Sequence, residues 1–118
     1  MSEKNMIEVL RDFGLSKREA EIYIFLAKRG LQKVQSVAAS LNMDRPQTYR
    51  ALKNLNEKGA VEATLEAPTR YSAVPFDILI DSLVKTKKSE VDHFEAQKEK
   101  LIAFWRSISI EGSEYPMA

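Results

Sequence analysis

The sequence predicts a mainly α-helical fold with a small β-hairpin wing: a winged helix-turn-helix followed by a long C-terminal helix. Two short helical patterns flank a four-residue polar turn between residues 34 and 58. An alternating stretch interrupted by a proline-containing loop follows over residues 60–74, and residues 76–108 contain neither proline nor glycine. Helical spacing, strand alternation and an uninterrupted helical run in this order are typical of that fold class.

The composition limits the architecture and the classes of function. The chain has 118 residues, of which 44% are hydrophobic and 30% charged, and it has no cysteine. This length suffices for one compact domain and one extended element, and no apolar run approaches the roughly 20 residues that span a bilayer. We therefore expect a cytoplasmic protein without a signal peptide, a membrane span, disulfides or thiolate metal sites.

The first three helices are predicted to form scaffold and the first half of the helix-turn-helix. An apolar stripe recurs at helical spacing over residues 3–13. Ser16 and Glu19 form a capping-box pattern that begins a second helix, which is expected to end before Gly30. A third helix is expected over residues 34–41, followed by the turn.

The fourth helix carries the clearest local signals. Asp44 can cap its N-terminus while Gln47 reaches back to the cap, and Pro46 is tolerated in the first turn. Gly59 ends the helix. The residues expected to face inward are Thr48, Leu52 and Leu55, and those on or near the opposite side are Arg45, Gln47, Tyr49, Arg50, Lys53 and Asn54.

The wing is expected to consist of two strands, residues 60–65 and 70–74, joined by a loop that contains Pro68. Positive charge concentrates just before it. Between Lys28 and Lys58 there are seven basic and two acidic residues, a local balance of 7 − 2 = +5 in a chain of net charge +1. Such asymmetry favours attachment to phosphate, although solvated helix faces also carry runs of this size.

The polar residues of this segment predict contacts with double-stranded DNA. The N-terminal half of the second helix of a helix-turn-helix enters the major groove, which predicts base contacts from Arg45, Gln47, Tyr49 and Arg50. Phosphate contacts are expected from Lys33, Ser36, Lys53 and Asn54, and wing contacts from Thr69 and Arg70. Arg70 could equally pair with Glu62 or Glu66 across the hairpin.

The long C-terminal helix, residues 76–108, is predicted to form a dimeric coiled coil. Its seam positions alternate at spacings of four and three residues: Ile80, Val84, Lys87, Val91, Phe94, Lys98, Leu101, Trp105 and Ile108. We expect the seven nonpolar members to form the homodimer interface. Alternatively, Ile80, Leu83 and Val84 pack back on the winged domain and the remainder is solvated. Residues 109–118 are expected to be a flexible tail.

Catalytic and metal-binding patterns do not stand out. His93 lies near Glu90 and Asp92, but these residues do not have the spacing of a metal site. There is no Gly-rich phosphate loop, nucleophile–base pairing or paired-carboxylate pattern. We expect no enzyme activity, no cofactor and no metal, and the residues nominate no small-molecule ligand.

Residues 10–91, about 70% of the chain, resemble the TrmB-like transcriptional regulators, a mainly archaeal winged-helix family. The motifs that carry the resemblance are Phe13-Gly14-Leu15-Ser16 with Glu19-Ala20 and Tyr23, Tyr49-Arg50-Ala51-Leu52 and Leu55 with Glu57-Lys58-Gly59, and Pro68-Thr69-Arg70-Tyr71-Ser72-Ala73-Val74-Pro75. The resemblance implies a sequence-specific DNA-binding regulator that dimerises through the helix after the wing. Larger members of the family carry a sugar-binding C-terminal domain, and we expect this chain to be a short form without it.

The remaining alternative is a protein-interaction module. A winged-helix domain can present the same surface to another protein, and the C-terminal helix could recruit a different chain. The sequence does not specify the operator, the choice between repression and activation, or the direction in which two C-terminal helices would pack.

Overall fold

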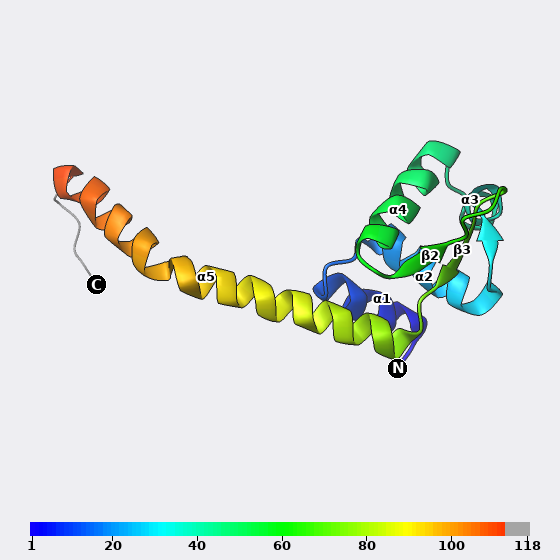
Figure 1. Ribbon diagram of the computed structural model, residues 1–118, viewed down its shortest axis with the longest axis horizontal. Helices are drawn as coiled ribbons and strands as arrows, with labels where there is room; N and C mark the ends of the chain where they lie inside the picture. Colours follow the sequence, from blue (N-terminus) through cyan, green and yellow to red (C-terminus); the bar gives the residue numbers. More distant parts are fainter. Residues whose placement is uncertain (113–118) are drawn as a thin grey trace. The chain divides into compact units, whose positions relative to one another are not determined.

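The computed structural model describes residues 1–112 and contains five helices and three short strands in that range (Figure 1). In chain order the elements are α1 (Glu3–Asp12), α2 (Lys17–Arg29), β1 (Gln32–Lys33), α3 (Val34–Leu41), α4 (Arg45–Glu57), β2 (Val61–Ala63), β3 (Arg70–Ala73) and α5 (Phe76–Gly112). The chain divides into two compact units, Met1–Val84 and a second that begins at Lys85. The predicted mainly helical fold with a small wing is confirmed.

The helix N-termini follow the predicted caps with one exception. The Ser16 hydroxyl accepts a hydrogen bond from the Glu19 backbone N–H at 3.1 Å, and the Glu19 carboxylate accepts one from the Ser16 N–H at 2.8 Å. At α4 the Asp44 carboxylate accepts from the Gln47 N–H at 2.7 Å. The expected reach of the Gln47 side chain back to Asp44 is wrong, because only the Asp44 half of the box is formed there. Gln47 thereby stays exposed at the surface.

The turn of the helix-turn-helix and the end of α4 use left-handed backbone conformations. Asn42 adopts φ 54° after α3, and Met43 follows it with its N–H bonded to the Ala38 carbonyl at 2.9 Å. Gly59 adopts φ 76°, and the Ala60 N–H reaches the Leu55 carbonyl at 2.8 Å. This is the helix-ending arrangement that favours glycine or asparagine at the left-handed position.

The core of the first unit lies where α2, α4 and the sheet meet. The largest side chains with no more than 1% exposure are Leu10, Ile22, Leu26, Leu52, Leu55 and Leu79. Thr48 is also fully buried, and its hydroxyl donates to the Asp44 carbonyl at 2.8 Å. The inward face predicted for α4 is thus confirmed, and its burial leaves the opposite face available to solvent.

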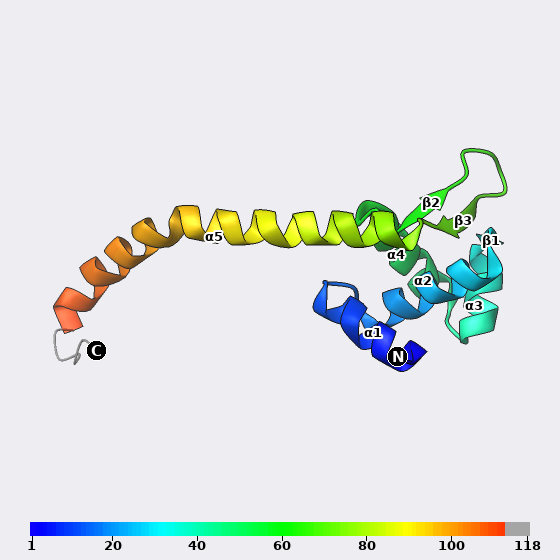
Figure 2. The same cartoon turned by 90° about the horizontal axis from the view of Figure 1, so that it is seen from below.

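The sheet has a strand that the sequence did not predict. Its order is β1-β3-β2, and both pairings are antiparallel. β1 is only two residues long and places Gln32 opposite Tyr71 and Lys33 opposite Arg70. A two-residue strand has too few positions to show alternation, so its presence depends on the partner that β3 offers. Figure 2 shows the β2–β3 loop projecting beyond the sheet.

The start of α5 packs into the core of the first unit, whereas nearly every described position beyond Val84 is exposed. Leu79 and Leu83 enter the core of the first unit, and Ile80 packs partly buried against it. The first compact unit therefore extends through Val84, in agreement with the alternative in which this end of the helix packs back on the winged domain. The helix continues through Gly112, beyond the end expected at residue 108. The flexible tail expected over residues 109–118 stays a prediction, and residues 113–118 lie outside the described residues.

Candidate nucleic-acid interface

The outer face of α4 presents the polar side chains that the sequence assigned to DNA. All six are exposed, including Tyr49 at 56%: Arg45, Gln47, Tyr49, Arg50, Lys53 and Asn54. Ala51 is buried together with the three predicted inward residues, which fixes the rotation of the helix. Arginine, lysine and amide side chains on one exposed helix face can donate to base edges and phosphate oxygens.

Arg45 connects the two helices of the motif. Its guanidinium donates a hydrogen bond from Nη2 to the Gln35 side-chain oxygen at 2.8 Å. Gln35 belongs to the first turn of α3, so this contact holds the side chain between α3 and α4. A guanidinium has five N–H donors, and the remaining donors of Arg45 stay available to an acceptor from outside.

Tyr49 has an electrostatic neighbour in the sheet, Tyr71, which the sequence did not predict as part of the site. Tyr71 of β3 is only 7% exposed, and its burial raises the pKa of its phenol, with the charge of the nearby Tyr49 raising that pKa further. The two residues lie on different elements, α4 and β3, so only the tertiary fold brings them near each other.

A pair of cations lies at the junction of β1, β3 and α3. Lys33 and Arg70 are direct partners in the antiparallel ladder, where opposite residues lie on the same face of the sheet. Lys33 also precedes the first residue of α3, and no side chain caps this helix. Its first N–H groups, including that of the half-buried Ser36, are thus left to solvent or to an anion.

Arg70 forms no ion pair with another of the described residues. Its side chain is exposed, and no ion pair with Glu62 or Glu66 is formed there. The wing is closed instead by main-chain contacts: the Arg70 N–H donates to the Thr64 hydroxyl and the Thr64 N–H to the Arg70 carbonyl, both at 2.9 Å. Thr69, the other predicted wing residue, is exposed beside it.

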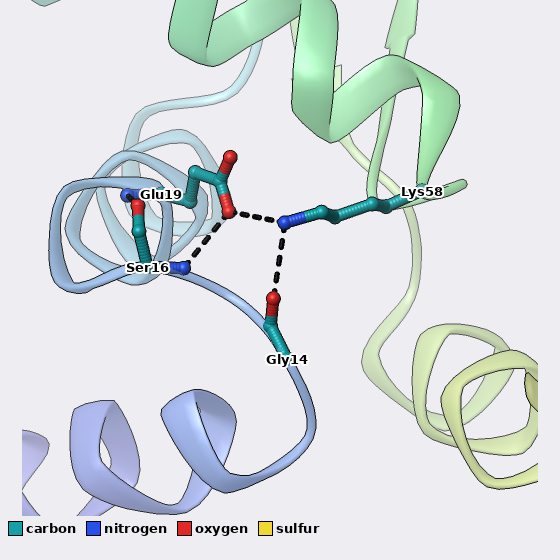
Figure 3. Close-up of polar contacts among 4 residues, drawn as sticks. All are labelled: Gly14, Ser16, Glu19 and Lys58. Atoms are coloured by element: carbon teal, nitrogen blue, oxygen red, sulfur yellow. Dashed lines mark hydrogen bonds and ion pairs between the residues drawn. The ribbon is translucent and has the colours of Figure 1, made fainter. Parts of the chain in front are cut away.

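Two of the seven basic residues counted toward the positive segment have structural roles instead. Lys28 of α2 forms an ion pair with Glu3 of α1. Lys58 donates to the Glu19 carboxylate at 2.6 Å and to the Gly14 carbonyl at 3.0 Å (Figure 3). Both acidic partners lie outside the segment, so the local balance falls from +5 to +3. Sequence counting missed this because the partners are 25 and 39 residues away.

Lys58 acts as a clamp between the end of α4 and the turn before α2. Glu19, which is 4% exposed, accepts from both the Lys58 ammonium and the Ser16 N–H at the same carboxylate oxygen, Oε1 (Figure 3). A buried carboxylate needs such partners because desolvation disfavours its charged form. The clamp fixes α4 at its C-terminal end, and the Arg45–Gln35 contact tethers it at the other end.

Over residues 1–112, no group of three or more His, Cys, Asp or Glu residues has an arrangement that could hold a metal ion. In the same part of the chain, no helix is both long and apolar enough to cross a membrane.

Comparisons with known proteins identify a family and structures with the same fold. Residues 10–77 match the model of the family described as "Sugar-specific transcriptional regulator TrmB". The chain is 25% identical over 116 residues to the HTH-type sugar sensing transcriptional regulator TrmBL1 of Pyrococcus furiosus. That alignment covers 98% of this chain and 33% of TrmBL1, so the chain spans about a third of its relative.

Solved structures show the same fold at lower identity. The structure of TrmBL2, an archaeal chromatin protein, superimposes with a TM-score of 0.78 at 22% identity, covering 98% of this chain and 45% of TrmBL2. The transcriptional regulator Tm0710 of Thermotoga maritima gives a TM-score of 0.55 at 13% identity, covering 93% of this chain and 85% of that protein.

Proposed function

The chain belongs to the TrmB family of transcriptional regulators, and from this premise we propose that it is a cytoplasmic, sequence-specific DNA-binding regulator that acts as a homodimer. In this proposal α4 enters the major groove, and the wing around β2 and β3 contacts the backbone or the minor groove. TrmBL2, an archaeal chromatin protein whose structure shows a novel mode of DNA binding, shares the fold. The surface described above supplies the chemistry.

The observation that carries the proposal is the pair of cations on the β1–β3 ladder. Like charges placed directly opposite each other on two strands repel, and this arrangement is unfavourable unless an anion lies between them. Lys33 and Arg70 are in that position, beside the uncapped N-terminus of α3. A DNA phosphate placed between the two side chains would reduce their repulsion and could also accept hydrogen bonds from the helix N–H groups.

The exposed face of α4 would then read sequence. Once the phosphate contacts fix the domain against the duplex, Arg45, Gln47 and Arg50 would face base edges in the major groove. Arginine pairs bidentately with guanine and glutamine with adenine, each good pair contributing about 1–3 kcal/mol of discrimination. Tyr49 would also reach base edges through its hydroxyl, while Lys53 and Asn54 would contact the sugar–phosphate backbone around these pairs.

The test begins with selection of bound duplexes from random DNA, followed by titration of the selected site in a salt series. The logarithm of the binding constant should fall linearly with the logarithm of salt concentration, with a slope of about −0.9 for each phosphate neutralised. Lys33→Ala and Arg70→Ala should each make this slope shallower by about 0.9. Lys85→Ala, an exposed lysine outside the winged domain, is the matched control and should leave the slope unchanged.

Two results would contradict the DNA-binding proposal. One is a selection that recovers no enriched sequence at low salt. The other is binding whose salt slope is the same in the Lys33 and Arg70 variants as in the original chain, because contacts that release no counterions cannot involve those two charges.

The protein-interaction alternative is supported by a different observation, the exposed apolar side chains of α5. Phe94, Leu101 and Trp105 are each at least 58% exposed. Light scattering of the pure protein at micromolar concentration separates the two functions. A dimer supports the regulator proposed here, whereas a monomer indicates that a different chain covers this helix.

A further inference from the structure

The seam of α5 beyond Val84 is exposed to solvent. The two lysines in this seam indicate how a second copy of the helix would cover it. Its nonpolar members are half or more exposed: Val91 at 53%, Phe94 at 64%, Leu101 at 60%, Trp105 at 58% and Ile108 at 50%. Two lysines, Lys87 and Lys98, interrupt this row. The inference that follows depends on the homodimer proposed above and adds the direction and register of its helices.

A parallel pair of helices would bring like charges together. Running side by side in register, Lys87 would face Lys87 and Lys98 would face Lys98 across the seam. At the flanks, where parallel coiled coils pair residues five apart between chains, Glu90 would meet Glu95 on both sides. Each lysine pair would place two ammonium groups close together at a partly dehydrated seam, where like charges repel.

We propose that two copies of α5 pack antiparallel. In the proposed register, the residue numbers of two seam residues that face each other add up to 192. The layers are then Val84 with Ile108, Lys87 with Trp105, Val91 with Leu101, and Phe94 with Lys98, each occurring twice. Every lysine faces an aromatic ring and every remaining layer is nonpolar. At the flanks of the coil, the one contact between like charges is that of Glu95 with Glu95 of the second copy. It lies beside the twofold axis, at the solvated edge.

The contacts of Lys87 favour this arrangement. Its ammonium lies 3.7 Å from the Glu90 carboxylate on its own helix, which draws the charge toward the flank of the seam. The four-carbon stem is left to cover apolar surface, as lysine stems do when their charge reaches water. The face of Trp105 or Phe94 is also the best apolar surface for a lysine, because aromatic rings attract cations.

The neighbouring antiparallel registers are less favourable. A shift of one heptad in one direction, to a sum of 185, places Lys87 opposite Lys98. A shift in the other direction, to a sum of 199, removes the layers of Val84 and Lys87 and leaves six layers in place of eight within residues 84–108. The sum of 192 therefore combines the longest seam with no contact between lysines.

The register also sets the distance between the points where the two seams begin. Val84 of one copy lies beside Ile108 of the other, 24 residues along the helix. At 1.5 Å per residue this separates the two Val84 positions by about 36 Å along the coil.

Cysteine cross-linking tests the direction, because the chain has no native cysteine. Val91→Cys and Leu101→Cys chains, carrying different mass tags, are mixed at a concentration that populates dimers and then oxidised. The antiparallel register predicts the mixed Val91→Cys with Leu101→Cys dimer and little of either self-linked dimer. Ser89→Cys and Ala103→Cys, also summing to 192 but on the outer face of the coil, form the matched control pair and should stay unlinked.

Trp105, the single tryptophan, provides a second readout that needs no disulfide. A short-range quencher attached to Lys87→Cys should reduce Trp105 fluorescence in the antiparallel dimer, where the two residues share a layer. Within one helix they are 18 residues apart, about 27 Å, beyond the reach of a contact quencher. Quenching must therefore come from the second copy and disappear on dilution.

The outcomes separate direction from dimerisation. Self-linked Val91→Cys and Leu101→Cys dimers without quenching would overturn the antiparallel direction and leave the homodimer and DNA binding intact. A chain that remains monomeric in light scattering, with neither cross-links nor quenching, would overturn the direction and the homodimer together. DNA binding by the winged domain is measured separately in the salt titration.

Discussion

The two ends of α5 have the same kind of apolar spacing and opposite surroundings. In the first nine residues Leu79 and Leu83 are 0% and 5% exposed, because the core of the winged domain covers them. Beyond Val84, Phe94 and Trp105 are 64% and 58% exposed. A helical stripe thus indicates which side of a helix is apolar, and the neighbouring elements determine whether the same chain covers it.

The contrast between the two ends of α5 predicts which substitutions change the stability of the chain and which change its assembly. The winged domain satisfies its own buried groups: in residues 1–108, no buried side-chain nitrogen or oxygen lacks a hydrogen-bond partner. The second unit, from Lys85 onward, has exposed side chains at nearly every described position. Substitutions in the first unit should therefore change the free energy of unfolding, and those in the second should change association.

The largest effect is expected from a matched pair of leucines, one in each region. Leu52→Ala removes a fully buried side chain from α4 and should lower the free energy of unfolding by about 2–5 kcal/mol, through lost burial and the cavity left behind. Leu101→Ala removes a side chain that is 60% exposed and should change monomer stability by less than about 0.5 kcal/mol while weakening the dimer. Urea unfolding and light scattering measure the two effects. Equal destabilisation by both would remove the contrast.

Lys58→Met tests whether the clamp belongs to the self-contained region. The methionine keeps the aliphatic stem, but the buried Glu19 carboxylate loses its ammonium partner and the Gly14 carbonyl loses a donor. We expect a loss of about 1–3 kcal/mol in the free energy of unfolding, as for a buried polar group deprived of a partner. Lys53→Met, on the exposed face of the same helix, is the control for stability. A neutral Lys58→Met would mean that water replaces the ion pair.

Arg50→Ala should separate DNA recognition from folding within the winged domain. Its side chain is exposed on the outer face of α4, so unfolding should shift by less than about 0.5 kcal/mol. Affinity for the selected DNA site should fall by about 1–3 kcal/mol, with preference relaxed at one base pair. Arg11→Ala, an exposed arginine of α1, serves as the control. Loss of binding by both variants would indicate that only net charge matters.

Tyr23→Phe should give the smallest effect and a distinct pH dependence. The Tyr23 hydroxyl donates to the Val74 carbonyl at 2.7 Å, and its loss should lower stability by about 0.5–1.5 kcal/mol at neutral pH. Burial raises the pKa of Tyr23 above its usual 10.0, and the Asp77 charge raises it further. The native state then holds its proton longer than the unfolded state, so this contribution is fully present below pH 10 and is lost as pH rises through the raised pKa. Tyr23→Phe should reduce that alkaline decline. An alkaline unfolding curve of unchanged steepness would exclude Tyr23 as its source.

The sequence anticipated the features that depend on neighbouring residues. The Ser16–Glu19 box, the Asp44 cap, the Gly59 ending and the inward face of α4 all arise within one helical turn or along one face. The contact expected from the Gln47 side chain back to Asp44 is not formed, because a capping box needs a side-chain rotamer that the sequence does not specify. The helix end expected at Ile108 was also wrong, because no strong ending signal precedes Gly112.

The sequence by itself determined the order of the helices and of the two wing strands, the side of each helix that is apolar and the set of polar residues on the outer face of α4, because these follow from local spacing and chain chemistry. The tertiary structure alone decided that β1 pairs with β3, that Lys33 lies opposite Arg70, and that Lys58 and Lys28 neutralise distant acids. Such pairings join residues far apart along the chain, and no local pattern encodes a partner that only folding brings within reach.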